Sequence, residues 1–382
     1  MDFATLALIS LVGVLGPLLA LPRRWNLPVV LGEQVAGIAL GRTGFDVLHA
    51  GNGTFTFLAD IGFALIMFVA GSHVPVRDPN LRAGLRLGAL RAMAVGAVSV
   101  VLAIGIAHGF GTGHAALYAV LIASSSAALV LPIVDSLGLS GDAVLQMLPQ
   151  VAIADTVCIV ALPLAIDPKH AGRAALGTLA VLACAAVLFV VLGYLERSGL
   201  RKRVHNVSED RKFALELRIN LMILFALAAL AVRTHVSIML AGFSFGVAMA
   251  AVGEPRRLAR QLFALSDGFL GPLFFIWLGA SLDLRALGRH SSFIVLGVLL
   301  GAAAVAAHGL MRLTGQPIRV GALAAAQLGV PVAAATVGAQ LLEPGEAPAL
   351  LLGALLTVAV AVVSSGLLAR TAQLRATPPG RP

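Results

Sequence analysis

Residues 142–162 read DAVLQMLPQVAIADTVCIVAL, an apolar run that begins at Asp142 and carries one further acid, Asp155, in its interior. A membrane-spanning helix needs about 20 predominantly apolar residues, so this run predicts one. A charged side chain at the centre of such a helix costs about 2.5–3.5 kcal/mol on insertion scales, and it is a candidate functional residue by default. This stretch therefore predicts both a membrane fold and the position of its chemistry.

The whole chain has the composition of this run. Of its 382 residues, 59% are hydrophobic and 12% are charged, and the mean hydropathy is +0.96. Soluble proteins carry about 25% charged residues, so the composition excludes a water-soluble enzyme. The net charge of +9 indicates basic cytoplasmic loops rather than a nucleic-acid partner. Cys158 and Cys184 both lie in apolar runs and predict neither a disulfide framework nor a metal site.

Thirteen apolar segments follow one another along the chain, and we predict an all-α membrane protein with 13 transmembrane helices. The segments are 3–21, 27–41, 56–74, 88–109, 113–138, 143–165, 173–195, 213–232, 236–252, 261–282, 291–311, 318–341 and 347–369. Alternating the loops between the two sides places 20 Lys and Arg residues on one side, Arg91 among them, and 6 on the other. The basic side is predicted to be cytoplasmic, which puts the N-terminus outside and the C-terminus inside.

An offset of about 207 residues superposes the first six segments on the last six, which is the spacing of a repeat. The shift is an odd number of segments, so we predict inverted six-helix repeats, an architecture typical of secondary transporters. The segments 113–138 and 318–341 occupy equivalent places, and each carries breaking residues: Ser124, Ser125, Ser126 and Pro132 in one, Gln327, Gly329 and Pro331 in the other. We expect two crossed discontinuous helices around an ion site, although packing serines and a simple proline kink are the alternative.

Asp155 is the residue predicted to bind both the cation and the proton. Its oxygens suit Na⁺ or K⁺ as well as H⁺, and competition for one carboxylate is the minimal chemistry of an antiporter. Ser124, Ser125, Ser126, Thr156 and Gln327 are candidate lining residues. Glu216 and His308 are candidate secondary proton or charge sites, with a helix-terminal acid and a packing histidine as the structural alternatives.

Four stretches of the chain resemble a known family. They are LPVVLGEQVAGIALG at 27–41, LADIGFALIMFVAG at 58–71, SSSAALVLP at 124–132 and PLFFIWLGASLD at 272–283. In order and spacing they resemble the transmembrane domain of bacterial monovalent cation:proton antiporters, the Kef-type branch of the Na⁺/H⁺ exchanger superfamily. The resemblance covers nearly the whole chain.

The resemblance implies a division of labour among the segments. Residues 1–87 and 213–282 would form a panel that dimerises, residues 88–165 and 289–370 a moving core that carries the ion, and 173–195 a linker helix. A short disordered cytoplasmic tail is expected at 371–382. Asp155 matches the ion-binding aspartate of the family. A homodimer in a bacterial inner membrane follows as an expectation, with monovalent cations and protons as partners and no cofactor.

Three departures from the family pattern bear on the mechanism. Ala154 precedes the aspartate where the family often has Asp, Asn or Gln, and 302–304 are alanines where it often has a Lys. The segment 318–341 also lacks the glutamate that often ends the family's motif there. With a single acid at the site, we predict the electroneutral exchange of one cation for one proton. The sequence leaves open whether the cation is Na⁺, K⁺ or Li⁺.

Other functions compete with this interpretation. A Na⁺-coupled symporter for an organic anion on a related fold is the main alternative, although ten spans would be usual for it. An intramembrane transferase would need paired acids or a catalytic dyad, and neither a DxxxD nor an HExxH pattern occurs, so we expect no enzyme. A channel and a weakened carrier stay open.

Overall fold

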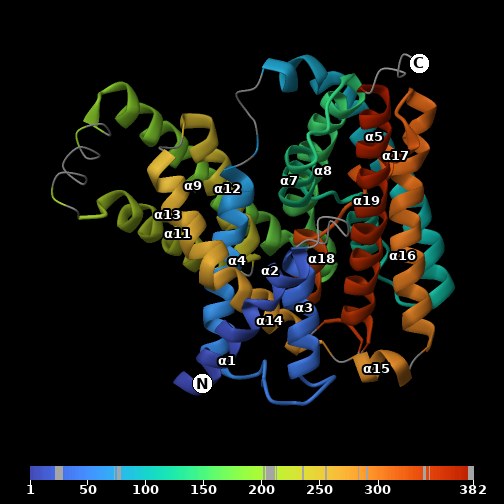
Figure 1. Ribbon diagram of the computed structural model, residues 1–382, viewed down its shortest axis with the longest axis horizontal. Helices are drawn as coiled ribbons and strands as arrows, with labels where there is room; N and C mark the ends of the chain where they lie inside the picture. Colours follow the sequence, from blue (N-terminus) through green and yellow to red (C-terminus); the bar gives the residue numbers. More distant parts are fainter. Residues whose placement is uncertain are drawn as a thin grey trace, which may run out of the picture. The chain divides into compact units, whose positions relative to one another are not determined.

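The computed structural model describes residues 1–21, 29–72, 74, 79–200, 203, 211, 213–234, 236–253, 256–282, 284–289, 291–338, 341–343 and 345–376. Every regular element in these residues is a helix (Figure 1). Nine helices within the described ranges are long and apolar enough to cross a membrane: Gly53–Ser72, Gly84–Phe110, Asp142–Ile166, Ala171–Arg197, Leu215–Arg233, Gln261–Ser281, Ser291–Thr314, Ile318–Val337 and Glu346–Thr371. The described part of the chain is thus all-helical, with helices of the length and composition that a multi-pass membrane protein needs.

Each of the 13 predicted segments overlaps a helix or an interrupted helix. Shorter apolar helices occupy Phe3–Leu18, Ala115–Leu131 and Ile238–Val252. A twelve-residue helix, Val29–Leu40, overlaps the segment 27–41, whose residues 27 and 28 lie outside the described ones. The number of membrane crossings, their orientation and the inverted repeat stay predictions.

The chain divides into two compact units. Unit 1 consists of residues 1–77 and 169–283, and unit 2 of residues 78–168 and 284–382. The roles of panel and core that the resemblance implies for similar ranges stay predictions.

Unit 1 is built on helix pairs that approach each other closely. Its helices are α1 (Phe3–Gly13), α2 (Leu15–Ala20), α3 (Val29–Leu40), α4 (Gly53–Ser72), α9 (Ala171–Arg197), α11 (Leu215–Arg233), α12 (Ile238–Val252), α13 (Arg256–Leu265) and α14 (Gly271–Ser281), with a π-helical turn at Ser266–Leu270 between the last two. Helix α4 packs on α12, and α3 packs on α14.

Glycines make this close approach possible. A side-chain carbon at Gly37 of α3 would collide with the backbone of Ile276 in α14, and one at Gly279 would collide with the backbone of Gln34. Gly71 of α4 and Gly246 of α12 approach the partner backbone in the same way. Small residues are the usual means of helix packing in membranes, where lipid is as apolar as leucine.

Unit 2 contains the two interrupted helices. Its helices are α5 (Pro79–Phe110), α6 (Ala115–Ala123), α7 (Ala127–Ser136), α8 (Asp142–Ile166), α15 (Leu284–Arg289), α16 (Ser291–Gly309), α17 (Ile318–Ala324), α18 (Gly329–Val337) and α19 (Glu346–Ala376). Helices α16 and α19 run side by side along this unit (Figure 1).

Both segments that the sequence predicts to be discontinuous are interrupted. Residues 124–126 separate α6 from α7, and residues 325–328 separate α17 from α18. Helix α19 continues through Ala376, into the range expected as a tail, and residues 377–382 lie outside the described ones. Arg91, which the charge count placed with the loops, lies inside α5 and is buried.

Candidate ion-binding site

Asp155 is buried in unit 2, and its carboxylate meets the first interrupted helix. Only 5% of the residue is exposed. Its Oδ2 accepts a hydrogen bond of 2.8 Å from the backbone N–H of Ala127, the first residue of α7. The N-terminus of a helix carries partial positive charge and unpaired N–H groups, and both stabilise an anion. The break at 124–126 therefore gives the buried carboxylate a partner that no side chain supplies.

The other carboxylate oxygen of Asp155 is available to a ligand. Within the described part of the chain, Oδ1 accepts no hydrogen bond, and no cation pairs with the carboxylate. A buried carboxylate needs a proton, a cation or further hydrogen bonds to be stable. The arrangement thus holds one oxygen in place and leaves the second free to bind H⁺ or a monovalent cation.

Two of the three serines in the break use their hydroxyls to hold the backbone. The Oγ of Ser124 donates to the carbonyl of Leu121 at 2.8 Å, and that of Ser125 donates to the carbonyl of Ala324 at the end of α17. Ser126 is also buried, and its hydroxyl makes no hydrogen bond within the described residues. Its carbonyl accepts the backbone N–H of Val130 at 2.9 Å.

Gln327, in the second interruption, connects the two breaks. Its Nε2 donates to the carbonyls of Leu121 at 2.7 Å and Ser124 at 3.3 Å. Its backbone N–H donates to the Oγ1 of Thr357 in α19 at 3.2 Å. Together with the Ser125 bond to Ala324, these contacts hold the two broken segments against each other.

The remaining predicted residues lie elsewhere. Thr156 is exposed, and its hydroxyl donates to the carbonyl of Ala152 in its own helix at 2.8 Å. His308 of α16 is buried, with Nδ1 at 2.9 Å from the carbonyl of Ala304, and its Nε2 has no partner among the described residues. Glu216 is half-buried in α11 of unit 1. The structure thus brings together Asp155, the three serines and Gln327.

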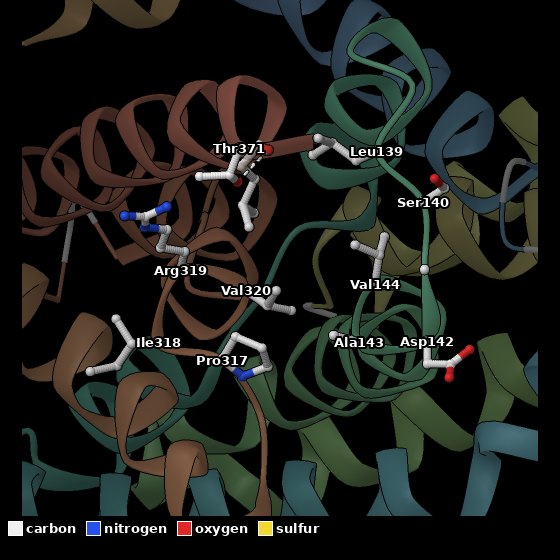
Figure 2. A pocket seen from close by; sticks show the side chains of 12 residues that line it. Leu139, Ser140, Asp142, Ala143, Val144, Pro317, Ile318, Arg319, Val320 and Thr371 are labelled. Atoms are coloured by element: carbon white, nitrogen blue, oxygen red, sulfur yellow. Dashed lines mark hydrogen bonds between the residues drawn. The ribbon is translucent and has the colours of Figure 1, made fainter. Parts of the chain in front are cut away.

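A separate pocket of about 590 Å³ opens in unit 2. The α7–α8 loop, the starts of α8 and α17, and the end of α19 line it (Figure 2). Figure 2 shows Arg319 and Asp142 on opposite sides of this pocket. None of its described lining residues belongs to the predicted ion site.

Two members of the site have no clear signal in the sequence. The N–H of Ala127 is a backbone group, which any residue except proline would supply. Thr357 is one of three hydroxyl residues in the apolar segment 347–369, and such residues usually bond their own helix, as Thr357 also does to Ala354 at 2.7 Å.

Comparisons with known proteins place the chain among named antiporters and potassium-efflux proteins by similarity. YjbQ of Bacillus subtilis, provisionally named a Na⁺/H⁺ antiporter, is 24% identical over 78% of this chain and 50% of its own length. The glutathione-regulated potassium-efflux system protein KefC of an Enterobacter species is 29% identical over 78% of this chain and 48% of its own length. The chain thus spans about half the length of these two relatives.

Solved structures show the same fold. The sodium proton antiporter MjNhaP1 from Methanocaldococcus jannaschii superposes with a TM-score of 0.69 and 16% identity, covering 100% of both chains. The family described as "Sodium/hydrogen exchanger, transmembrane" matches residues 7–372. That match covers nearly the whole sequence, and this chain therefore belongs to the sodium/hydrogen exchanger transmembrane family.

Proposed function

We propose that this protein exchanges a monovalent cation, Na⁺ or K⁺, for a proton across a bacterial inner membrane. The observation that carries the proposal is the carboxylate of Asp155. Its Oδ2 accepts the Ala127 N–H, and its Oδ1 is available to a ligand. Membership in the exchanger family and relatives named Na⁺/H⁺ antiporters support it.

Competition between the two ions at one carboxylate couples their movements. When Asp155 holds a proton, its charge is neutral and the attraction for a cation is lost. When the proton leaves, the carboxylate, which the N-terminus of α7 holds in place, presents a site for one cation. In our proposal the loaded site alternates between the two sides of the membrane, and each turnover moves one cation against one proton without net charge.

The surrounding oxygens decide which cation binds best. The Ser126 hydroxyl and the backbone carbonyls of the break are hard oxygen ligands of the kind that alkali cations use. We propose that unit 2 carries the ion and that unit 1 forms the panel of a homodimer. Relatives named for Na⁺ and for potassium efflux make both cations worth testing.

Exchange by purified protein in proteoliposomes with an internal pH dye tests the proposal. A proton gradient is imposed, Na⁺, K⁺ or Li⁺ is added outside, and valinomycin clamps the voltage in parallel samples. We expect at least one cation to collapse the gradient in the wild type and none to do so in Asp155→Asn. Asp142→Asn is the matched control, because Asp142 is an exposed acid in the first turn of the same helix.

Each outcome decides one part of the proposal. Exchange that survives Asp155→Asn would contradict the assignment of the shared site. A rate that changes under the voltage clamp would contradict electroneutral exchange. If no cation collapses the gradient in the wild type, the antiporter proposal fails and a Na⁺-coupled organic-anion symporter becomes the function to test.

A further inference from the structure

A second buried acid lies in unit 2, away from Asp155. Glu346, the first residue of α19, is 0% exposed. Its Oε1 accepts the hydroxyl of Tyr118 at 2.6 Å and lies 2.8 Å from Nδ1 of His114. Its Oε2 accepts the backbone N–H of Glu343 at 3.3 Å. Nothing in the exchange chemistry proposed above uses this cluster.

We infer that Glu346, His114 and Tyr118 form a second proton-binding site, which holds the starts of α6 and α19 together and makes exchange depend on pH at that side of the membrane. The dependence of exchange on this site rests on the proposed function, whereas the proton binding does not. In the predicted orientation, this side of the membrane is the external one.

Burial makes the cluster sensitive to a proton. Within the described residues, Glu346 makes one ion pair, and its partner is His114. When the imidazole is protonated, its charge balances the carboxylate, and Nδ1–H donates to Oε1. When the imidazole loses that proton, a net negative charge stays behind in a fully buried position, which is strongly unfavourable. Histidine is the side chain that exchanges a proton between about pH 5 and 8.

His114 also provides the path for the proton. Its side chain is 26% exposed, whereas that of Glu346 is 0% exposed. A proton that leaves the imidazolium therefore passes to water without opening the contact between α6 and α19. Tyr118 keeps its hydroxyl hydrogen and donates it to the carboxylate in both states.

The cluster joins two helices, α6 and α19, and both of them contact the interruptions at the ion site. Helix α6 ends at Ala123, and the carbonyls of Leu121 and Ser124 at this end accept the side chain of Gln327. Helix α19 carries Thr357, which accepts the backbone N–H of the same Gln327. Nine residues of α6 span about 13 Å at 1.5 Å per residue, so a change at its start reaches the break through one short rigid helix.

Other titratable groups near the cluster do not replace His114. Glu343 acts electrostatically on Tyr118 and is an acid, so it cannot neutralise Glu346. The helices that pack on α6 and α19 carry further described titratable residues, namely Arg86, Arg91, His108, Asp142, Asp155, Cys158, Arg285, His308 and Arg319. His108 is exposed. Asp155 accepts from Ala127, and His308 bonds the carbonyl of Ala304. Arg319 lines the pocket near the other end of α19.

Unfolding of the purified protein in detergent tests the proton site without any transport. We expect the wild-type unfolding temperature to fall as the pH rises from about 5.5 to 8.5, because the charged pair is lost when the imidazole deprotonates. His114→Gln and Glu346→Gln should flatten this dependence about threefold or more. His108→Gln, which changes an exposed histidine at the end of α5, should behave as the wild type does.

Exchange in proteoliposomes, with the pH varied on each side in turn, tests the regulation. We expect His114→Gln to flatten the pH profile on one side and to leave the other side unchanged. A pH dependence of unfolding that persists in His114→Gln and Glu346→Gln overturns the proton site. A flattened unfolding profile with an unchanged exchange profile overturns the regulation.

The two proposals fail separately. If the wild type exchanges no cation, the proposed function fails, and the unfolding series still decides whether the cluster binds a proton. If Glu346→Gln does not fold, Tyr118→Phe takes its place, because it keeps both charged groups and removes one hydrogen bond. That variant should be less stable at every pH and should keep the wild-type pH dependence, and a flattened profile in it would contradict the assignment of the proton to His114.

Discussion

The two interruptions of unit 2 resemble each other in sequence position and differ in what they do. The first, at 124–126, points the N-terminus of α7 at a carboxylate, since Ala127 donates to Asp155. The second, at 325–328, has no described acid at the start of α18, and its Gln327 reaches across to Leu121 and Ser124. One break presents a binding group and the other fastens it in place.

This difference teaches that equivalent positions of a predicted repeat need not share a task. The family resemblance includes a glutamate in the segment 318–341, where this chain has the run Gln327 to Pro331. Without that acid, the second break is free to serve as a support. The predictions below test whether the two roles are as separate as their contacts indicate.

Ala127→Pro should have the largest effect on cation binding. Proline lacks the N–H that donates to Asp155 and is well tolerated at the first position of a helix. A hydrogen bond to a charged group contributes about 1.5–3 kcal/mol, so the apparent cation affinity should fall about 10-fold to 100-fold. Ala127→Gly keeps the N–H and is the control. Wild-type affinity in Ala127→Pro would show that α7 does not hold the carboxylate.

Gln327→Leu should affect stability rather than affinity. It leaves the buried carbonyls of Leu121 and Ser124 without this donor, and we expect the free energy of unfolding to fall by about 1–2 kcal/mol. The apparent KM for the cation should stay within about twofold of the wild type. Gln146→Leu, a half-buried glutamine on α8, is the control for stability. A KM that rises more than stability falls would make Gln327 an ion ligand.

Thr357→Val should weaken the same support by a smaller amount. Valine keeps the branched shape and removes the oxygen that accepts the Gln327 N–H, so we expect a loss of about 0.5–1 kcal/mol in unfolding free energy. Thr336→Val is matched to it, because the hydroxyl of Thr336 donates to carbonyls of its own helix, Val332 and Ala333. If both variants lose the same unfolding free energy, the bond between Thr357 and Gln327 does not stabilise the second break.

Ser126→Ala should change stability least, by less than about 0.5 kcal/mol, because its hydroxyl bonds no described residue. Its effect should appear as an altered preference among Na⁺, K⁺ and Li⁺ in exchange assays. Ser125→Ala removes the bond to Ala324 and should do the opposite, lowering stability while leaving the preference unchanged. If Ser125→Ala changes the ion preference and Ser126→Ala lowers stability, then Ser125 is the ion ligand and Ser126 supports the fold.

The helices and the breaks could be predicted from the sequence because membrane burial leaves a strong pattern. Apolar runs define the helices, and two of them are interrupted, at Ser124 and its neighbours and at Gln327 and its neighbours. Asp155 stands out as an acid in the middle of an apolar run. Thr156 shows the limit of such patterns, because neighbours on a helix point about 100° apart, and Thr156 is exposed beside the buried Asp155.

Contacts between distant segments could not be predicted in this way. Glu346 meets Tyr118 across 228 residues of sequence, and neither residue signals its partner. Arg91 was counted with the loops because it lies near the start of an apolar segment, although it is buried and donates to Thr314 at 2.9 Å. A sequence predicts which face of a helix is apolar, whereas the helix that packs against that face is known only from the folded structure.

The glycine contacts of unit 1 have a mechanical consequence. Gly37 and Gly279 each admit the backbone of the opposite helix, and a side-chain carbon at either position would collide with a backbone oxygen there. A slide of one helix along the other would move these glycines away from the backbone that they admit, and the close contact would be lost. The glycine contacts therefore favour one register in each helix pair, and we expect α3 with α14 and α4 with α12 to tilt or rotate as blocks rather than to slide past each other.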